Sequence, residues 1–180
     1  MSDQSISGGV GMPDDWQRLW APHRMSYLEG ENRPLPENEL PCPFCRITTL
    51  SDQEALIVAR GKEAYVVMNL YPYNAGHLLI CTNRHVAELP ELTDSERNEV
   101  SELTSKAMKV LRHVSNAAGF NIGMNQGSVS GAGIAGHLHQ HVVPRWAGDA
   151  NFMPIIGKTK VLPKLLQDSR DQLAAGWNQI

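Results

Sequence analysis

The clearest periodic pattern in the chain is a run of apolar residues that return every three or four positions after Thr93. This spacing places the apolar side chains on one face of an α-helix. Thr93 and Glu96 form the T-x-x-E pattern of a capping box, which predicts the start of the helix, and Gly119 is expected to stop it. The apolar positions are Val100, Leu103, Ala107, Val110, Leu111 and Val114.

Five shorter segments have the apolar and β-branched character of strands. They are residues 55–59, 64–69, 76–81, 120–124 and 137–143, the last ended by Pro144. Gly61 and Lys62 lie between the first two, which predicts a hairpin. Further helices are expected over 14–20 and 160–176, with a proline-containing loop over 30–41. Strands mixed with one long helix indicate an α+β fold.

Length and charge narrow the class of protein. A chain of 180 residues suggests residues 1–12 as a flexible polar tail and 13–180 as a single domain. The net charge of −3 argues against nucleic acid as a partner, and no apolar run is long enough to cross a bilayer. The tail lacks the basic start and apolar stretch of a secretory signal. We therefore expect a cytoplasmic protein that binds neither nucleic acid nor membranes.

Three histidines alternate in the last predicted strand. Because successive side chains of a strand point to opposite faces, His137, His139 and His141 share one face. A neutral imidazole is nucleophilic near pH 7, although a histidine-rich edge strand or a metal site would also explain the pattern. The loop 127–136 directly before the strand has four glycines and two serines. Its backbone N–H groups can approach an anion, which favours catalysis.

Several ordered motifs connect the chain to a known family. The segment HLHQHVV at 137–143, the block NLYPYNAGH at 69–77, and the flanking NQG at 125–127 and PRWAGD at 144–149 resemble the histidine triad superfamily of nucleotide hydrolases and transferases. The resemblance covers about residues 42–150 and implies a mainly antiparallel five-stranded sheet. The whole chain is most similar to the short bacterial diadenosine tetraphosphate phosphorylases. It departs from the pattern at Gln140, where an apolar residue is usual; that side chain points away from the triad.

The resemblance implies roles for single residues. The middle histidine, His139, corresponds to the nucleophile, His141 to a group that assists at the phosphate or leaving group, and His77 to a buried histidine that orients the triad. The family also implies a substrate-binding set in which Asn69 holds the ribose and Gln126 contacts phosphate oxygens. The complete predicted set is Asn69, Asn125, Gln126, Ser128, Ser130, Gly133, Gly136 and Arg145.

The spacing of two cysteines indicates a candidate metal site. Cys42 and Cys45 have the two-residue gap of a zinc knuckle, but a single pair supplies only two of four ligands. The resemblance implies that His85 and His137 complete a closed, structural zinc site. Two buried thiols without a metal are the alternative, and no cofactor is expected to be required for catalysis. Cys81 has the pattern of a small buried hydrophobe.

The whole-chain resemblance implies a nucleotidyltransferase that phosphorolyses diadenosine tetraphosphate to ATP and ADP through a nucleotidyl-histidine intermediate. The substrates would be the nucleotide and inorganic phosphate, and the resemblance implies a homodimer or higher homo-oligomer. One alternative is a hydrolase of dinucleoside polyphosphates or nucleoside phosphoramidates, with water as acceptor. Another is a non-catalytic, zinc-stabilised nucleotide-binding protein, although a protein that had lost catalysis would be expected to lose His139.

Overall fold

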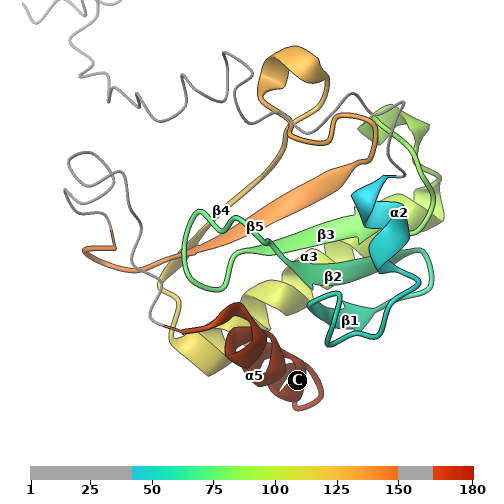
Figure 1. Cartoon of the computed structure of the whole chain (residues 1–180). Helices are drawn as coiled ribbons and strands as arrows, with labels where there is room; N and C mark the ends of the chain where they lie inside the picture. The colour runs from blue at the N-terminus through green and yellow to red at the C-terminus, as the bar shows by residue number, and fades with distance from the viewer. Residues whose placement is uncertain (1–41, 150–163) are drawn as a thin grey trace, which may run out of the picture. The chain divides into compact units, whose positions relative to one another are not determined.

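The centre of the structure, a computed structural model that describes residues 42–149 and 164–180, is an antiparallel five-stranded sheet (Figure 1). The strand order is β1-β2-β3-β5-β4. The strands are β1 Ile57–Arg60, β2 Ala64–Met68, β3 Leu78–Thr82, β4 Gly119–Met124 and β5 His139–Arg145. This confirms the predicted α+β class with a mainly antiparallel sheet, and the strands lie close to the segments predicted from the sequence.

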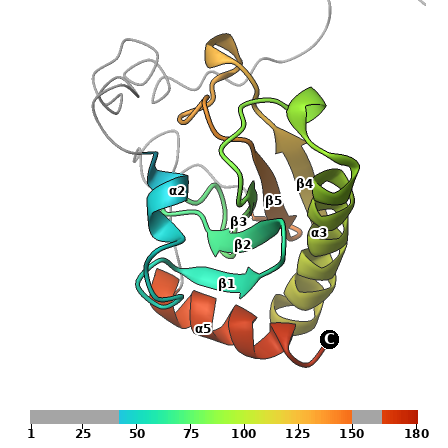
Figure 2. The same ribbon diagram turned by 90° about the vertical axis from the view of Figure 1, so that its right-hand side faces the viewer.

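Helices lie on both faces of the sheet (Figure 2). The long helix α3, Asp94–Ser115, contacts β2, β3 and β5, and α5, Leu166–Trp177, contacts α3 and β1. The short helix α2, Pro43–Ile47, places Phe44 in a separate cluster on the opposite face. Every residue of β2 and β3 is therefore buried, and the two strands form the centre of the core.

The long helix begins as predicted and ends earlier. Thr93 is the N-cap, and its capping box with Glu96 is complete. The helix stops at Ser115 because Asn116 takes a left-handed conformation, with φ 52°, that ends the helical hydrogen bonding. The prediction that Gly119 stops the helix is wrong, since Gly119 begins β4 and pairs with Arg145.

Strand β5 also differs from the prediction at both ends. It begins at His139 rather than His137, because the preceding Leu138 donates its N–H to the Val86 carbonyl (2.6 Å) outside the sheet. It continues through Pro144 to Arg145 instead of ending at the proline. Pro144 is tolerated because the ladder to β3 ends at Val142, so that only β4 lies beside it.

Gln140 is accommodated on the face of the sheet that α3 covers. Its amide donates to Thr104 Oγ1 of α3 (2.5 Å), and that hydroxyl donates to the Val100 carbonyl (2.6 Å). A polar residue at this position therefore has a hydrogen-bonding partner.

Other predictions concern residues outside the described ranges. The tail 1–12, the helix 14–20, the loop 30–41 and the first four residues of the helix 160–176 all lie there; the rest of that last helix corresponds to α5. None of the described helices combines the length and the apolar character needed to cross a membrane.

Candidate active site

The histidines of β5 project from the face of the sheet opposite α3. His139 is paired with Cys81 and His141 with Leu79, and both partners belong to the cluster beneath α2. Directly paired residues of neighbouring strands lie on the same face. The two histidines and Phe44 therefore share one side of the molecule, as the alternation in the sequence predicts.

His139 has the tautomer that a nucleophile needs. Its Nδ1 lies 2.8 Å from the His137 carbonyl oxygen, which can only accept, so the proton is on Nδ1 and Nε2 carries a lone pair. The residue is buried, and the Phe44 ring packs 4.9 Å from its own. Burial lowers the pKa of His139, with the carbonyl hydrogen bond opposing part of that effect. The imidazole is thus held neutral and nucleophilic.

The tautomers of His77 and His141 follow from a backbone donor. Tyr73 N–H donates to His77 Nδ1 (3.0 Å), so that atom cannot carry a proton and His77 is protonated on Nε2. This Nε2–H reaches His141 Nδ1 at 2.9 Å, which leaves the proton of a neutral His141 on its own Nε2. Burial, followed by the nearby His139, lowers the pKa of His141 to about 4. His141 is therefore a neutral N–H donor near pH 7.

The Nε2–H of His141 is available to donate a hydrogen bond to a ligand. Its Nε2 is buried and has no hydrogen-bonding partner among the residues that the structure describes. A buried N–H without an acceptor is costly, and such groups mark places where a ligand can supply one. An oxygen of a bound phosphate group would meet this need.

Asn69 lies beside His77 and supports it. Its amide nitrogen is 3.3 Å from His77 Nδ1, and its amide oxygen accepts from Tyr71 N–H (3.0 Å). The Tyr73 ring packs on His77 and stacks almost parallel to His141, with 13° between the planes. In this structure Asn69 thus orients the histidine pair; the contact with ribose stays a prediction.

The glycine-rich loop lies at the same end of the sheet as His139. It leaves β4 at Met124, which pairs with Gln140, and Ile134 within it packs on the Phe44 cluster. The predicted residues Ser128, Ser130, Gly133 and Gly136 belong to it, and Asn125 lies between the end of β4 and the loop. Gly127 and Gly131 have φ of 78° and 85°, the conformation that favours glycine.

Two predicted substrate contacts have protein partners in the structure. Gln126 Oε1 accepts from Leu89 N–H (2.6 Å). Arg145 pairs with Asp149 through two hydrogen bonds (2.7 and 2.8 Å) and donates to Asn121. Arg145 lies four residues beyond His141, about 13 Å along the strand. The structure therefore does not bring Arg145 to the histidines, and its phosphate contact stays a prediction.

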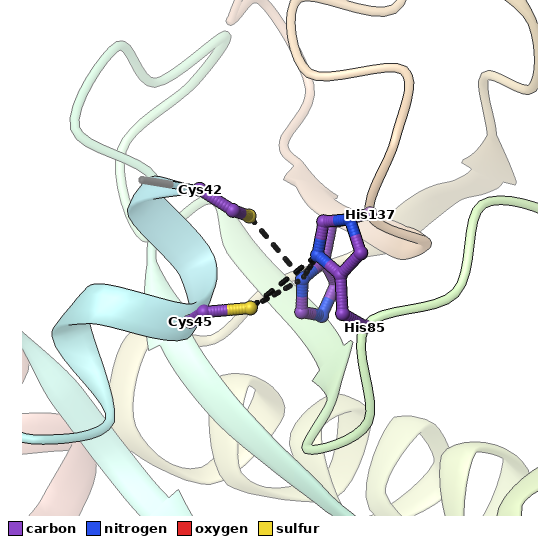
Figure 3. Close-up of side chains that lie close together, drawn as sticks. All are labelled: Cys42, Cys45, His85 and His137. Atoms are coloured by element: carbon purple, nitrogen blue, oxygen red, sulfur yellow. Dashed lines mark hydrogen bonds between the residues drawn. The ribbon is translucent and has the colours of Figure 1, made fainter. Parts of the chain in front are cut away.

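The four predicted metal ligands do converge (Figure 3). The cysteines come from the start of α2, His85 follows β3, and His137 precedes β5. The donor atoms of Cys42, Cys45, His85 and His137 all lie within 4.8 Å of one another. The two histidine nitrogens lie 3.3 Å apart, and the nitrogen-to-sulfur distances are 3.4 to 3.5 Å. Tetrahedral donors about 2.0–2.3 Å from one ion have such spacings.

The protonation states of His137 and Cys45 favour the binding of a cation. His137 Nε2–H donates to the Thr82 carbonyl (2.8 Å), so its Nδ1 lone pair points toward the other donors. Burial, followed by the neighbouring Cys42, raises the pKa of Cys45, so that its thiolate needs a positive charge beside it. These four residues can hold a metal ion.

Three residues of this site were missed by the sequence reasoning. Phe44 lies between Cys42 and Cys45, and Tyr73 lies between Asn69 and His77, so an aromatic residue inside each motif was a signal that could have identified them. Thr82 acts through its backbone carbonyl, for which the residue type carries no signal.

Comparisons with known proteins agree with this geometry. The model of the HIT domain matches residues 51–148. A Mycobacterium tuberculosis protein named AP-4-A phosphorylase is 51% identical over 172 residues, covering 94% of this chain and 88% of that protein. An uncharacterized HIT-like protein of Methanocaldococcus jannaschii is 30% identical, over 62% of this chain and 84% of that one.

A solved structure shares the fold. A zinc-bound histidine triad family protein from Mycobacterium smegmatis matches with a TM-score of 0.64 and 23% identity, over 77% of this chain and 94% of that one. The match to the HIT domain model covers more than half of the chain, and the matched residues include the five-stranded sheet and the triad histidines. The chain therefore belongs to the HIT (histidine triad) family.

Proposed function

We propose that this chain is a nucleotidyltransferase that phosphorolyses diadenosine tetraphosphate to ATP and ADP. The observation that carries the proposal is the pair of adjacent imidazoles with opposite roles, the Nε2 lone pair of the buried residue His139 and the buried Nε2–H of His141. The relative from Mycobacterium tuberculosis, whose name specifies an AP-4-A phosphorylase, supports the choice of substrate.

The reaction proceeds in two displacements. His139 Nε2 attacks the phosphorus nearest one adenosine, forms an N–P bond, and breaks the P–O bond to the remaining chain, which leaves as ATP. An oxygen of inorganic phosphate then attacks the same phosphorus and breaks the N–P bond. The product is ADP, and the imidazole returns to its starting tautomer.

The surrounding residues stabilise charge during both steps. The His137 carbonyl accepts the Nδ1–H of His139 and stabilises the imidazole as it becomes positive in the intermediate. His141 Nε2–H donates to a phosphate oxygen as negative charge moves onto the leaving chain. The glycine-rich loop beside His139 offers backbone N–H groups for the polyphosphate and for the incoming phosphate.

Product analysis tests this proposal. With diadenosine tetraphosphate as substrate, ATP and ADP should form at a rate that rises with phosphate and nearly vanishes without it. ATP and AMP at a rate indifferent to phosphate would make the protein a hydrolase. His139→Asn should abolish both turnover and the covalent adduct, and retained turnover in this variant would overturn the nucleophile assignment. His113→Asn, the same change at an exposed histidine of α3, is the matched control.

The metal centre is proposed to hold zinc. Two thiolates and two imidazoles are a donor set that zinc favours, and four protein ligands leave no open position for chemistry. Its role is therefore structural. Purified protein should contain about one zinc per chain. Cys42→Ala should lose the metal while Cys81→Ala, outside the cluster, retains it; equal metal content in both would refute the assignment.

The proposal includes a homo-oligomer in the cytoplasm. β4 is an edge strand of the sheet, and its Ile122 side chain is 45% exposed. An unpaired edge with an apolar residue is a surface on which another copy can pack. Sedimentation should therefore give a mass above that of one chain, and Ile122→Lys should lower it. A monomer at micromolar concentration would refute this part.

A further inference from the structure

We propose that Phe44 is a positioning residue for His139, and that metal binding at Cys42 and Cys45 holds it in place. The inference rests on the proposed function, in which His139 is the nucleophile. It makes the metal centre a support for the nucleophile as well as for the fold.

The first observation is the position of the Phe44 ring. It lies 4.9 Å from the His139 ring, at 44° between the planes, and 5.5 Å from the His137 ring, at 67°. The side chain is buried, with 8% exposure. One aromatic ring therefore contacts both a metal ligand and the nucleophile.

The second observation is that His139 needs this support. Its Nδ1–H bond to the His137 carbonyl selects the tautomer. A hydrogen bond at one ring atom leaves the ring able to tilt about that atom, so packing must decide where Nε2 points. The other ring beside it is His141, 5.1 Å away. Phe44 and His141 together restrict the direction of the attacking lone pair.

The third observation concerns what holds Phe44. Helix α2 has five residues and no side-chain cap at its N-terminus, so it is too short to be stable alone. Tyr65 OH donates to the Phe44 carbonyl (2.8 Å) and anchors the beginning of the helix to β2. The metal ligands Cys42 and Cys45 flank Phe44 in the sequence. Figure 3 shows both cysteines on α2, with their sulfur atoms turned toward His137 and His85. A bound ion would tie both ends of this segment to His85 and His137.

These contacts form a continuous path from metal to nucleophile. The ion holds the cysteines, the cysteines place Phe44, and Phe44 packs against His139. Misplacing a catalytic group by about 1 Å can cost about 100-fold in rate. Loss of the Phe44 ring should therefore reduce kcat, while the binding of substrate through its adenosine and phosphates is retained.

The test compares Phe44→Leu with Phe120→Leu, the same change at a partly buried aromatic of β4. In holoprotein labelled with ¹⁵N-histidine, the ring nitrogen signals of His139 should shift or broaden in Phe44→Leu and stay in place in Phe120→Leu. Zinc content should remain near one per chain. The expected kinetic result is a kcat lower by about 10- to 100-fold, with KM changed by less than about threefold.

Two further measurements complete the test. Phe44→Tyr keeps the ring and should restore both the His139 signals and kcat. Phe44→Met offers a longer apolar side chain if leucine releases the metal. Unchanged His139 signals and kcat in a folded, zinc-loaded Phe44→Leu would overturn the inference. If the signals change but no variant and no wild-type protein degrades diadenosine tetraphosphate, the positioning role stands and the proposed function fails.

Discussion

Replacing His77 by leucine should slow turnover strongly while leaving substrate affinity nearly unchanged. His77 is fully buried and donates its Nε2–H to His141 Nδ1 at 2.9 Å. Leucine is similar in size and cannot donate. His141 then loses the partner that selects its Nε2–H tautomer, and the tautomer with a proton on Nδ1 becomes accessible. That tautomer offers no donor to the leaving phosphate chain.

The magnitude follows from the hydrogen bonds that are lost. A buried polar group left without its partner costs about 1–3 kcal/mol. The substitution leaves His141 Nδ1 without its partner, on the ring that acts in the reaction. It also removes the contacts of the Tyr73 N–H (3.0 Å) and the Asn69 amide nitrogen (3.3 Å) with His77 Nδ1, and these two groups do not act in the reaction. If the first cost appears in the activation barrier, kcat falls by about 5- to 150-fold, since about 1.4 kcal/mol is tenfold in rate. The second cost appears as lower unfolding free energy.

Steady-state phosphorolysis of diadenosine tetraphosphate gives kcat and KM, and thermal unfolding gives the loss of folding stability. His77→Gln is the matched variant, because its amide nitrogen can replace the lost Nε2–H donor toward His141. It should recover a large part of kcat. A wild-type kcat in a folded His77→Leu protein would refute the claim that His77 sets the tautomer of His141. A His77→Gln variant no faster than His77→Leu would refute it as well.

Three further predictions concern stability. The pKa of His141 is about 4 in the folded protein, whereas an unfolded histidine titrates near 6.5. Between pH 4 and about 6.5, the unfolded chain therefore binds a proton at this residue that the folded protein does not. The free energy of unfolding should then fall as pH drops from about 6.5 to 4, less steeply in His141→Asn; identical slopes would contradict this. Glu99→Ala should lower the free energy of unfolding, measured by chemical denaturation, by about 2 kcal/mol, because the Glu99 carboxylate accepts three backbone N–H bonds from residues 62–64. Glu102→Ala, the same change at an exposed residue, should leave it unchanged. Gly76→Ala should cost about 1–3 kcal/mol because φ is 75° and a Cβ would lie 3.2 Å from Leu111; an unchanged melting temperature would refute this.

The arrangement of the main elements was predictable because it depends on local patterns. Period-2 alternation placed His139 and His141 on one face, and the capping box at Thr93 marked the start of the long helix. The spacing of Cys42 and Cys45 indicated two ligands of a metal site, whereas His85 and His137 were predicted as ligands through the family resemblance. For these features the sequence alone carried the signal, because each depends on side-chain identity at short range or on a motif.

Tertiary structure alone decided how the groups of the site are held. The tautomer of His77 depends on a backbone N–H, and the orientation of His137 on the Thr82 carbonyl, 55 residues away in sequence. Every residue carries such backbone groups, so residue type does not reveal which of them will be donors or acceptors at a site. Arg145 is a further example, because the turn after β5 places Asp149 beside it, a pairing that its residue type did not predict; its phosphate contact stays a prediction. Partners of this kind are chosen by long-range register and turn geometry, which exist only once the sheet has formed.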